Sequence, residues 1–136
     1  MKKKIWVITS LLALLSYHNV VTGQEVVRKS YAYFSLEPEI VTNYLSSKAK
    51  KLGFVRVSIE LMLENPDFLE LAEHHSPLLR AATIEVFGNQ RAERIRSLTG
   101  RENIRIICLE KLQKLMLKET GSKMVKDVIF TKYLYF

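Results

Sequence analysis

The sequence predicts an α+β fold in which a small antiparallel or mixed sheet packs against two main helices. In residues 54–64 the apolar side chains from Val55 to Leu63 alternate with Arg56, Ser58 and Glu60, as in a half-buried strand. Residues 65–88 and 101–121 have the ends and the apolar spacing of helices. Residues 123–136 return to a β-rich composition. Strands followed by helices and a last strand indicate a sheet with helices packed on it.

The first 23 residues have the three parts of an export signal. Lys2–Lys4 precede an apolar stretch over 5–15, and a more polar end follows. This stretch is shorter than the roughly 20 apolar residues of a membrane-spanning helix and fits a signal-peptide core. We expect cleavage after Gly23, and an uncleaved short anchor reaching Val21 is the alternative. Both place the rest of the chain outside the cytoplasm.

The exported part is expected to be one domain over residues 33–136, after a short linker over 24–32. The chain carries a formal charge of +7, but removing residues 1–23 leaves 18 basic against 14 acidic residues, or +4. This charge is spread along the chain, with neither an RNA-binding signature nor zinc-finger spacing. We therefore expect no nucleic-acid partner.

The first strand-forming segment covers residues 33–45 and contains Pro38, which cannot donate a ladder hydrogen bond. It is therefore expected at a sheet edge or as two short strands. A polar loop over 46–53 leads into the alternating strand. The side of that strand expected to be buried consists of Val55, Val57, Ile59, Leu61 and Leu63.

Each helix is predicted from its end signals. Asn65 is placed as the N-cap of the first helix, Pro66 in its first turn and Gly88 at its end. Residues 91–100 are expected to form a short helix or turn that leads to a break. Gly121 should end the long helix.

The doublet His74–His75 is the most conspicuous candidate for metal or acid–base chemistry. Adjacent helical residues diverge by about 100°, so both rings cannot easily hold one ion. The helical wheel places His74 on the polar face and His75 on the apolar face, with a bend expected near Pro77. A packed His75 and a solvated His74 are expected, with no metal bound.

Cys108 lies in the apolar stripe of the long helix and is expected to be a small buried side chain. With neither a glycine-rich phosphate loop nor a serine elbow in the sequence, we expect a non-enzyme without a cofactor.

Two sets of residues are candidates for a partner interface. Ile106 and Leu117 project opposite the main stripe of the long helix, although isolated exposed apolar residues are common. An arginine cluster is the second set; it is either a solvated face or a surface for an acidic partner. It consists of Arg91, Arg94, Arg96, Arg101 and Arg105.

The order of several segments resembles the FliL family of flagellar basal-body-associated proteins. These segments are "YFSLEPEIVTNYL", "VRVSIELMLENP", "HHSPLLRAATIEVFGNQRAERIRSLTGRENIR" and "VKDVIFTKYLYF". The resemblance implies a stomatin/prohibitin-like periplasmic domain, tethered to the inner membrane, that forms homo-oligomeric rings around stator units of the flagellar motor. It also implies support of torque and swarming, with no catalytic activity. It assigns no individual functional residues.

One departure from the family pattern concerns the N-terminus, where the apolar segment and the linker are both short. A cleaved form would be a soluble periplasmic relative, consistent with an accessory FliL-like protein. Two alternatives stay open: an envelope scaffold of stomatin-like fold without a flagellar role, and a small exported enzyme or metal binder at Glu73, His74 and His75.

Overall fold

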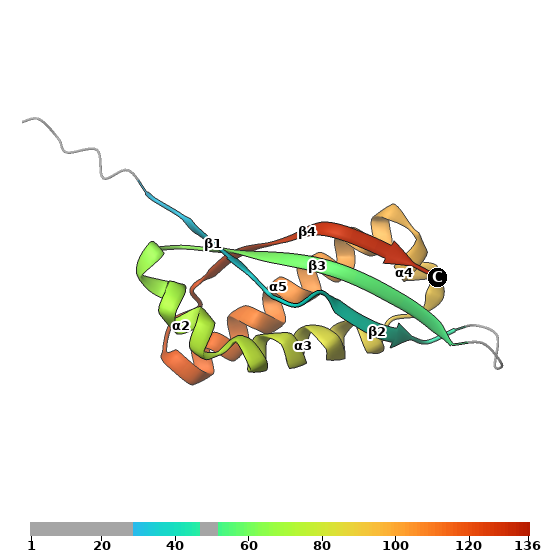
Figure 1. The fold of residues 1–136 in the computed structure, drawn as a ribbon, viewed down its shortest axis with the longest axis horizontal. Helices are drawn as coiled ribbons and strands as arrows, with labels where there is room; N and C mark the ends of the chain where they lie inside the picture. Colours follow the sequence, from blue (N-terminus) through green and yellow to red (C-terminus); the bar gives the residue numbers. More distant parts are fainter. Residues whose placement is uncertain (1–28, 47–51) are drawn as a thin grey trace, which may run out of the picture.

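The computed structural model describes residues 29–46 and 52–136. Its sheet is built around β3 (Gly53–Leu63), which pairs with every other strand. β1 (Ala32–Ser35) and β2 (Ile40–Tyr44) follow one another along one edge of β3, and β4 (Val125–Tyr135) lies along the other edge. All pairings are antiparallel, so the antiparallel form of the predicted α+β fold is the one adopted (Figure 1).

The alternation predicted for the central strand is confirmed. All five apolar residues expected on one side of β3 are buried, from Val55 to Leu63. The intervening side chains from Phe54 to Met62 are exposed or half-buried. The apolar face of the sheet is therefore buried, and the helices pack against it.

The split of the first strand-forming segment is also confirmed. β1 and β2 are separated around a cis Glu37–Pro38 peptide bond, yet Leu36 N–H still donates to the Ile59 carbonyl at 2.9 Å. From the helical layer, the Arg80 guanidinium donates to the Leu36 carbonyl at 2.9 Å and also to the Pro38 carbonyl. The Arg80 side chain therefore attaches the turn between β1 and β2 to the helical layer.

The single helix expected over 65–88 is in fact three pieces. They are η1 (Pro66–Phe68), α2 (Leu69–His74) and α3 (Ser76–Gly88). Asn65 caps the first piece as predicted, since its Oδ1 accepts from Asp67 N–H at 3.0 Å.

The break falls at His75, whose backbone (φ −93°, ψ 7°) leaves the helical region. Pro77 has no N–H to offer the Glu73 carbonyl, so the bend expected near Pro77 becomes a full interruption. At the other end of α3, Gly88 is the last helical residue and Asn89, with φ −90°, is the C-cap. Gly88 therefore adopts no left-handed conformation here.

The short helix and the break expected over 91–100 are both present: α4 (Ala92–Arg96) ends at Ser97, whose extended backbone (φ −97°, ψ 148°) separates it from α5 (Leu98–Thr120). The long helix begins earlier than the predicted residue 101, so Gly100 is buried in the first turn of α5. A Cβ atom at Gly100 would lie 2.1 Å from the Arg94 carbonyl oxygen. The glycine thus permits close approach of two helices. The end at Gly121 is confirmed, in a left-handed conformation with φ 78°.

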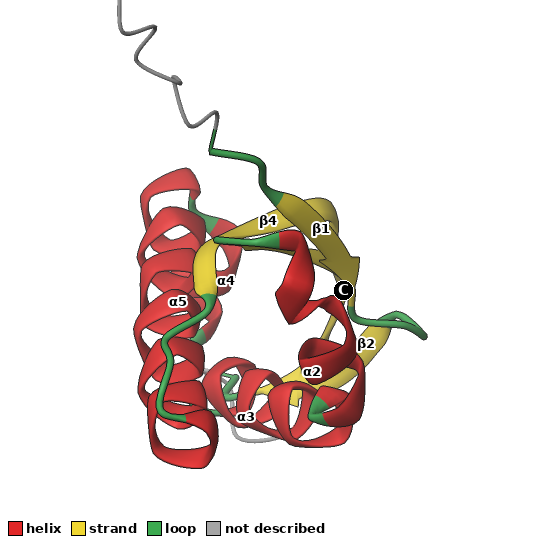
Figure 2. Ribbon diagram, turned by 90° about the vertical axis from the view of Figure 1, so that its left-hand side faces the viewer, coloured by secondary structure: helices red, strands yellow, loops and turns green. Residues whose placement is uncertain are grey.

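The helical layer consists mainly of α3 and α5, the two main helices of the prediction. α5 packs against β4 and α3, while α3 packs against β2 (Figure 2). α5 turns one buried stripe toward the sheet, made of Ile104, Cys108, Leu112 and Met116. Their spacing of four residues places them on one helix face.

The predicted export signal over 1–23, most of the linker and positions 47–51 of the predicted loop lie outside the described residues. Among the residues that are described, no helix combines the length and apolar composition needed to cross a bilayer.

Two glycine substitutions test the helix packing. Gly100→Ala should lower the free energy of unfolding by about 1–3 kcal/mol, because the new methyl group would overlap the Arg94 backbone. Gly88→Ala is the matched control, since its Cβ would meet its nearest neighbour, the Asn43 carbonyl oxygen, at 3.9 Å. It should be neutral or stabilising by up to about 1 kcal/mol. Urea unfolding followed by circular dichroism measures both, and equal effects would contradict this packing argument.

Candidate partner-binding surfaces

The histidine doublet is a local structural feature. His75 Nδ1 lies 2.9 Å from the Leu71 carbonyl oxygen, while His74 is exposed. The two ring centroids are 5.0 Å apart in an edge-to-face arrangement. His75 is half-buried, so the predicted division into a packed and a solvated histidine holds in outline. Among the described residues, no group of three or more His, Cys, Asp or Glu side chains is placed to hold a metal ion.

Cys108 is buried as predicted. Burial raises the pKa of its thiol to about 12, and the positive charge of Lys111 offsets this only in part. The thiolate, which is the reactive form, is therefore scarce at neutral pH. This residue contributes packing in the core.

The five arginines of the predicted cluster do not form one surface. Arg105 donates to Glu102 and to Asp127 of β4, so two carboxylates already neutralise it. Hydrogen bonding to Glu102 raises the pKa of Arg105, and the same bond lowers the pKa of Glu102. Arg101 lies 5.0 Å from the ring centre of Tyr133 and is half-buried.

The other three arginines are exposed: Arg91 is the N-cap of α4, and Arg94 and Arg96 lie within it. No carboxylate of the described chain forms an ion pair with them. Arg96 donates to the Tyr44 hydroxyl at 3.2 Å and lies 5.9 Å from the ring centre of Tyr135.

The start of α4 is held in place by Leu45, the residue that follows β2. Leu45 N–H donates to the Gln90 carbonyl at 2.8 Å, and Ala92 N–H donates to the Leu45 carbonyl at 3.0 Å. Leu98, which begins α5, is 85% exposed beside these arginines in sequence. We call Arg91, Arg94, Arg96 and Leu98 the basic end.

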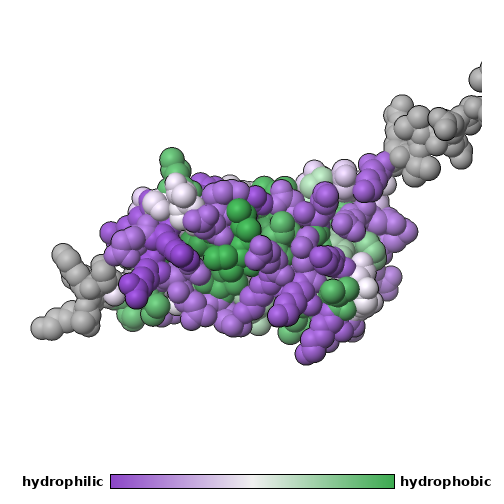
Figure 3. All heavy atoms as spheres, turned by 180° about the vertical axis from the view of Figure 1, so that it is seen from behind, coloured by the Kyte–Doolittle hydropathy of each residue, from purple (hydrophilic) through white to green (hydrophobic). Residues whose placement is uncertain are grey.

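Ile106 and Leu117 are exposed on α5, at 39% and 46%. Figure 3 shows the back of the molecule, where apolar groups gather near the centre and hydrophilic side chains surround them. The exposed positions of both residues agree with the helical wheel, and their role in binding stays a prediction.

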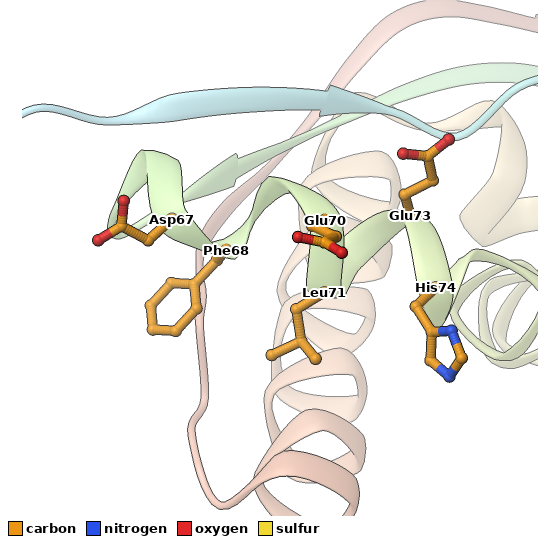
Figure 4. Close-up of a pocket in the computed structure, with 6 residues that line it drawn as sticks. All are labelled: Asp67, Phe68, Glu70, Leu71, Glu73 and His74. Carbon is orange, nitrogen blue, oxygen red and sulfur yellow. The ribbon is translucent and has the colours of Figure 1, made fainter.

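A second surface was missed by the sequence analysis. The segment η1–α2 lines an open depression of about 650 Å³. Phe68, Leu71 and His74 point to the same side of this segment, while Glu73 points to the other (Figure 4). We call this surface the acidic groove; its lining residues are Asp67, Phe68, Glu70, Leu71, Glu73 and His74.

The three carboxylates of the acidic groove form no ion pair with any described residue, and Asp67 accepts one hydrogen bond from Asn65 at 3.1 Å. The sequence signal for the groove is an acidic residue at every third position around two apolar ones. That signal also fits an ordinary solvated helix. Only the position of α2 at the end of the domain leaves Phe68 and Leu71 half-buried.

The comparison with known proteins identifies the family. The family described as "Flagellar basal body-associated protein FliL" matches residues 33–135, which is nearly all of the described domain. The chain belongs to the FliL family. A flagellar protein FliL of Aquifex aeolicus is 28% identical over 101 residues, which is 74% of this chain and 59% of that protein. The match thus spans little more than half the length of this relative. The family resemblance predicted from the ordered segments is confirmed.

Cys108 offers a test of core burial in this FliL domain. We expect no reaction of its thiol with a maleimide at pH 8 in the folded protein, and one equivalent of reaction in urea, because burial removes both access and thiolate. Thr99→Cys adds an exposed thiol as a control and should react without urea. Rapid labelling of the folded wild-type chain would show that Cys108 is accessible.

A second test uses pH. Burial raises the pKa of Cys108 from 9.0 and of Tyr133 from 10.0, each to about 12. The folded chain therefore keeps protons that the unfolded chain loses, so their stabilisation is present below pH about 9 and is lost as pH rises toward about 12. Cys108→Ala should flatten part of this decline in Tm, whereas Tyr33→Phe, at an exposed tyrosine, should not. Identical pH profiles for all three chains would contradict the assignment.

Proposed function

We propose that this FliL-family chain is a flagellar motor accessory protein that acts in the periplasm at the basal body. It self-associates around stator units and favours their active state, which supports torque and swarming motility. The observation that carries the proposal is the family match over residues 33–135. An envelope scaffold without a flagellar role is less well supported, because the description of the matched family is itself flagellar.

The proposed location rests on residues 1–23. Their basic start and short apolar stretch are those of a signal peptide or a short inner-membrane anchor. In both forms the domain over 33–136 lies in the periplasm, beside the periplasmic parts of the stator and the basal body.

A binding role also suits the surface chemistry of the domain. Arg91 and Arg94 are exposed cations without an acidic partner in the described chain, and Ile106 and Leu117 are exposed apolar side chains on one helix. Such residues are suited to contacts with other proteins. We propose the α5 surface around Ile106 as the stator-facing side.

In-cell photo-crosslinking tests this proposal. A photo-reactive residue at position 106 of the full chain, followed by mass spectrometry, should yield adducts with a stator subunit. The same residue at Val41, an exposed apolar position on the sheet, is the matched control and should not. In parallel, deletion of the gene should reduce the swarming radius, and the wild-type chain should restore it.

Two results would count against the proposed function. If swarming and motor torque stay normal after deletion of the gene, the proposed role in the motor is wrong. Equal stator adducts from positions 106 and 41 would show proximity to the stator without a specific α5 contact.

A further inference from the structure

We propose that the acidic groove of one copy binds the basic end of the next copy, so that FliL-family chains of this kind associate head to tail. The inference deepens the proposed function and rests on its self-association. It assigns the occupant of the groove to a second copy of this chain. Opposite charge at the two ends of one molecule, together with exposed apolar side chains at both, carries the assignment.

The acidic groove is suited to a cationic partner with an apolar tip. Phe68 and Leu71 are half-buried and form the apolar part of its lining, and Asp67 and Glu70 stand beside them. These carboxylates have no cation from the described chain to neutralise them. A partner that brings both an apolar side chain and positive charge would cover the two half-buried residues and pair the acids.

The basic end has those two properties. Leu98 is 85% exposed, the largest exposed fraction of any large apolar residue in the described chain. It follows Arg94 and Arg96 by a few residues and lines a shallow depression with residues that include Arg101 and Glu102. Neither Arg94 nor Arg96 forms an ion pair within the described chain, although the nearby charge of Glu93 acts on Arg96. If Leu98 of one copy packs between Phe68 and Leu71 of the next copy, Arg94 and Arg96 come to the rim of the acidic groove.

The two surfaces lie at opposite ends of the long axis of the molecule (Figure 1). A contact between unlike surfaces is heterologous, and a series of such contacts closes into a ring or grows as a filament. Neither Ile106 nor Leu117 of α5 lines the acidic groove or belongs to the basic end. Self-association and stator contact would thus use separate surfaces.

Charge reversal tests the contact. Glu70→Lys and Arg94→Glu are each expected to weaken self-association at least about tenfold, since each brings like charges together. The double variant Glu70→Lys/Arg94→Glu should regain association, because positions 70 and 94 then again carry opposite charges across each contact. Glu110→Lys and Lys126→Glu are controls of equal charge change at exposed positions outside both surfaces. Sedimentation velocity of protein purified from cells expressing the full chain measures all five variants.

Crosslinking distinguishes a head-to-tail contact from a symmetric one. His74→Cys places a thiol in the groove, and Thr99→Cys places one at the basic end. With a short bismaleimide, the double variant should give a ladder of oligomers, whereas the two single variants should give dimers only when mixed. Dimers from either single variant alone would indicate a symmetric interface and overturn the proposal.

The outcomes separate this inference from the function on which it rests. If the wild-type chain is monomeric at all concentrations, the proposed self-association itself is wrong. If the wild-type chain associates but Glu70→Lys and Arg94→Glu behave like their controls, self-association stands and this interface is wrong. Loss of association in both reversals without recovery in the double variant would also reject the pairing.

Discussion

The fold depends on the one-sided burial of β3. Five of its apolar side chains, from Val55 to Leu63, are buried on the face that the helices cover, so the stability of the sheet depends on that cover. The buried stripe of α5 meets this demand with a residue at every fourth position, including Ile104 and Met116. Among the described residues, every buried side-chain nitrogen or oxygen has a hydrogen-bond partner, so this packing leaves no buried polar side chain unpaired. Both edges of β3 are occupied as well, which makes it the strand on which the others align.

The same core determines where the basic end lies. Tyr44 is buried beside Gly53, where an added Cβ would lie 2.2 Å from the tyrosine ring. Its hydroxyl donates to the Phe136 carbonyl at 3.0 Å and accepts from Arg96 at 3.2 Å. One tyrosine therefore joins the end of the sheet to the end of α4. The arginine is positioned by the packing of a strand distant in sequence.

The sequence predicted those features that depend on local pattern. The alternating strand, the split edge and the helix ends with clear caps are of this kind, because each depends on a few neighbouring residues. The role of Gly100 could not be predicted, since it depends on the approach of a second helix. Likewise, Arg105 resembled the other arginines until the fold brought Asp127 beside it. The groove at Phe68 and Leu71 depends on what the rest of the chain leaves uncovered.

The outer edge of β4 affects whether copies of this domain can pair through their sheets. Gln113 and Arg101 of α5 donate to the Val125 and Phe130 carbonyls of β4, and Asp127 accepts from Val128 N–H. On the other side of the sheet, the edge is interrupted at a proline. Unpaired strand edges are templates for aggregation, and interruption or side-chain capping blunts them. These contacts and the proline therefore protect parts of both sheet edges against pairing with the strands of other copies.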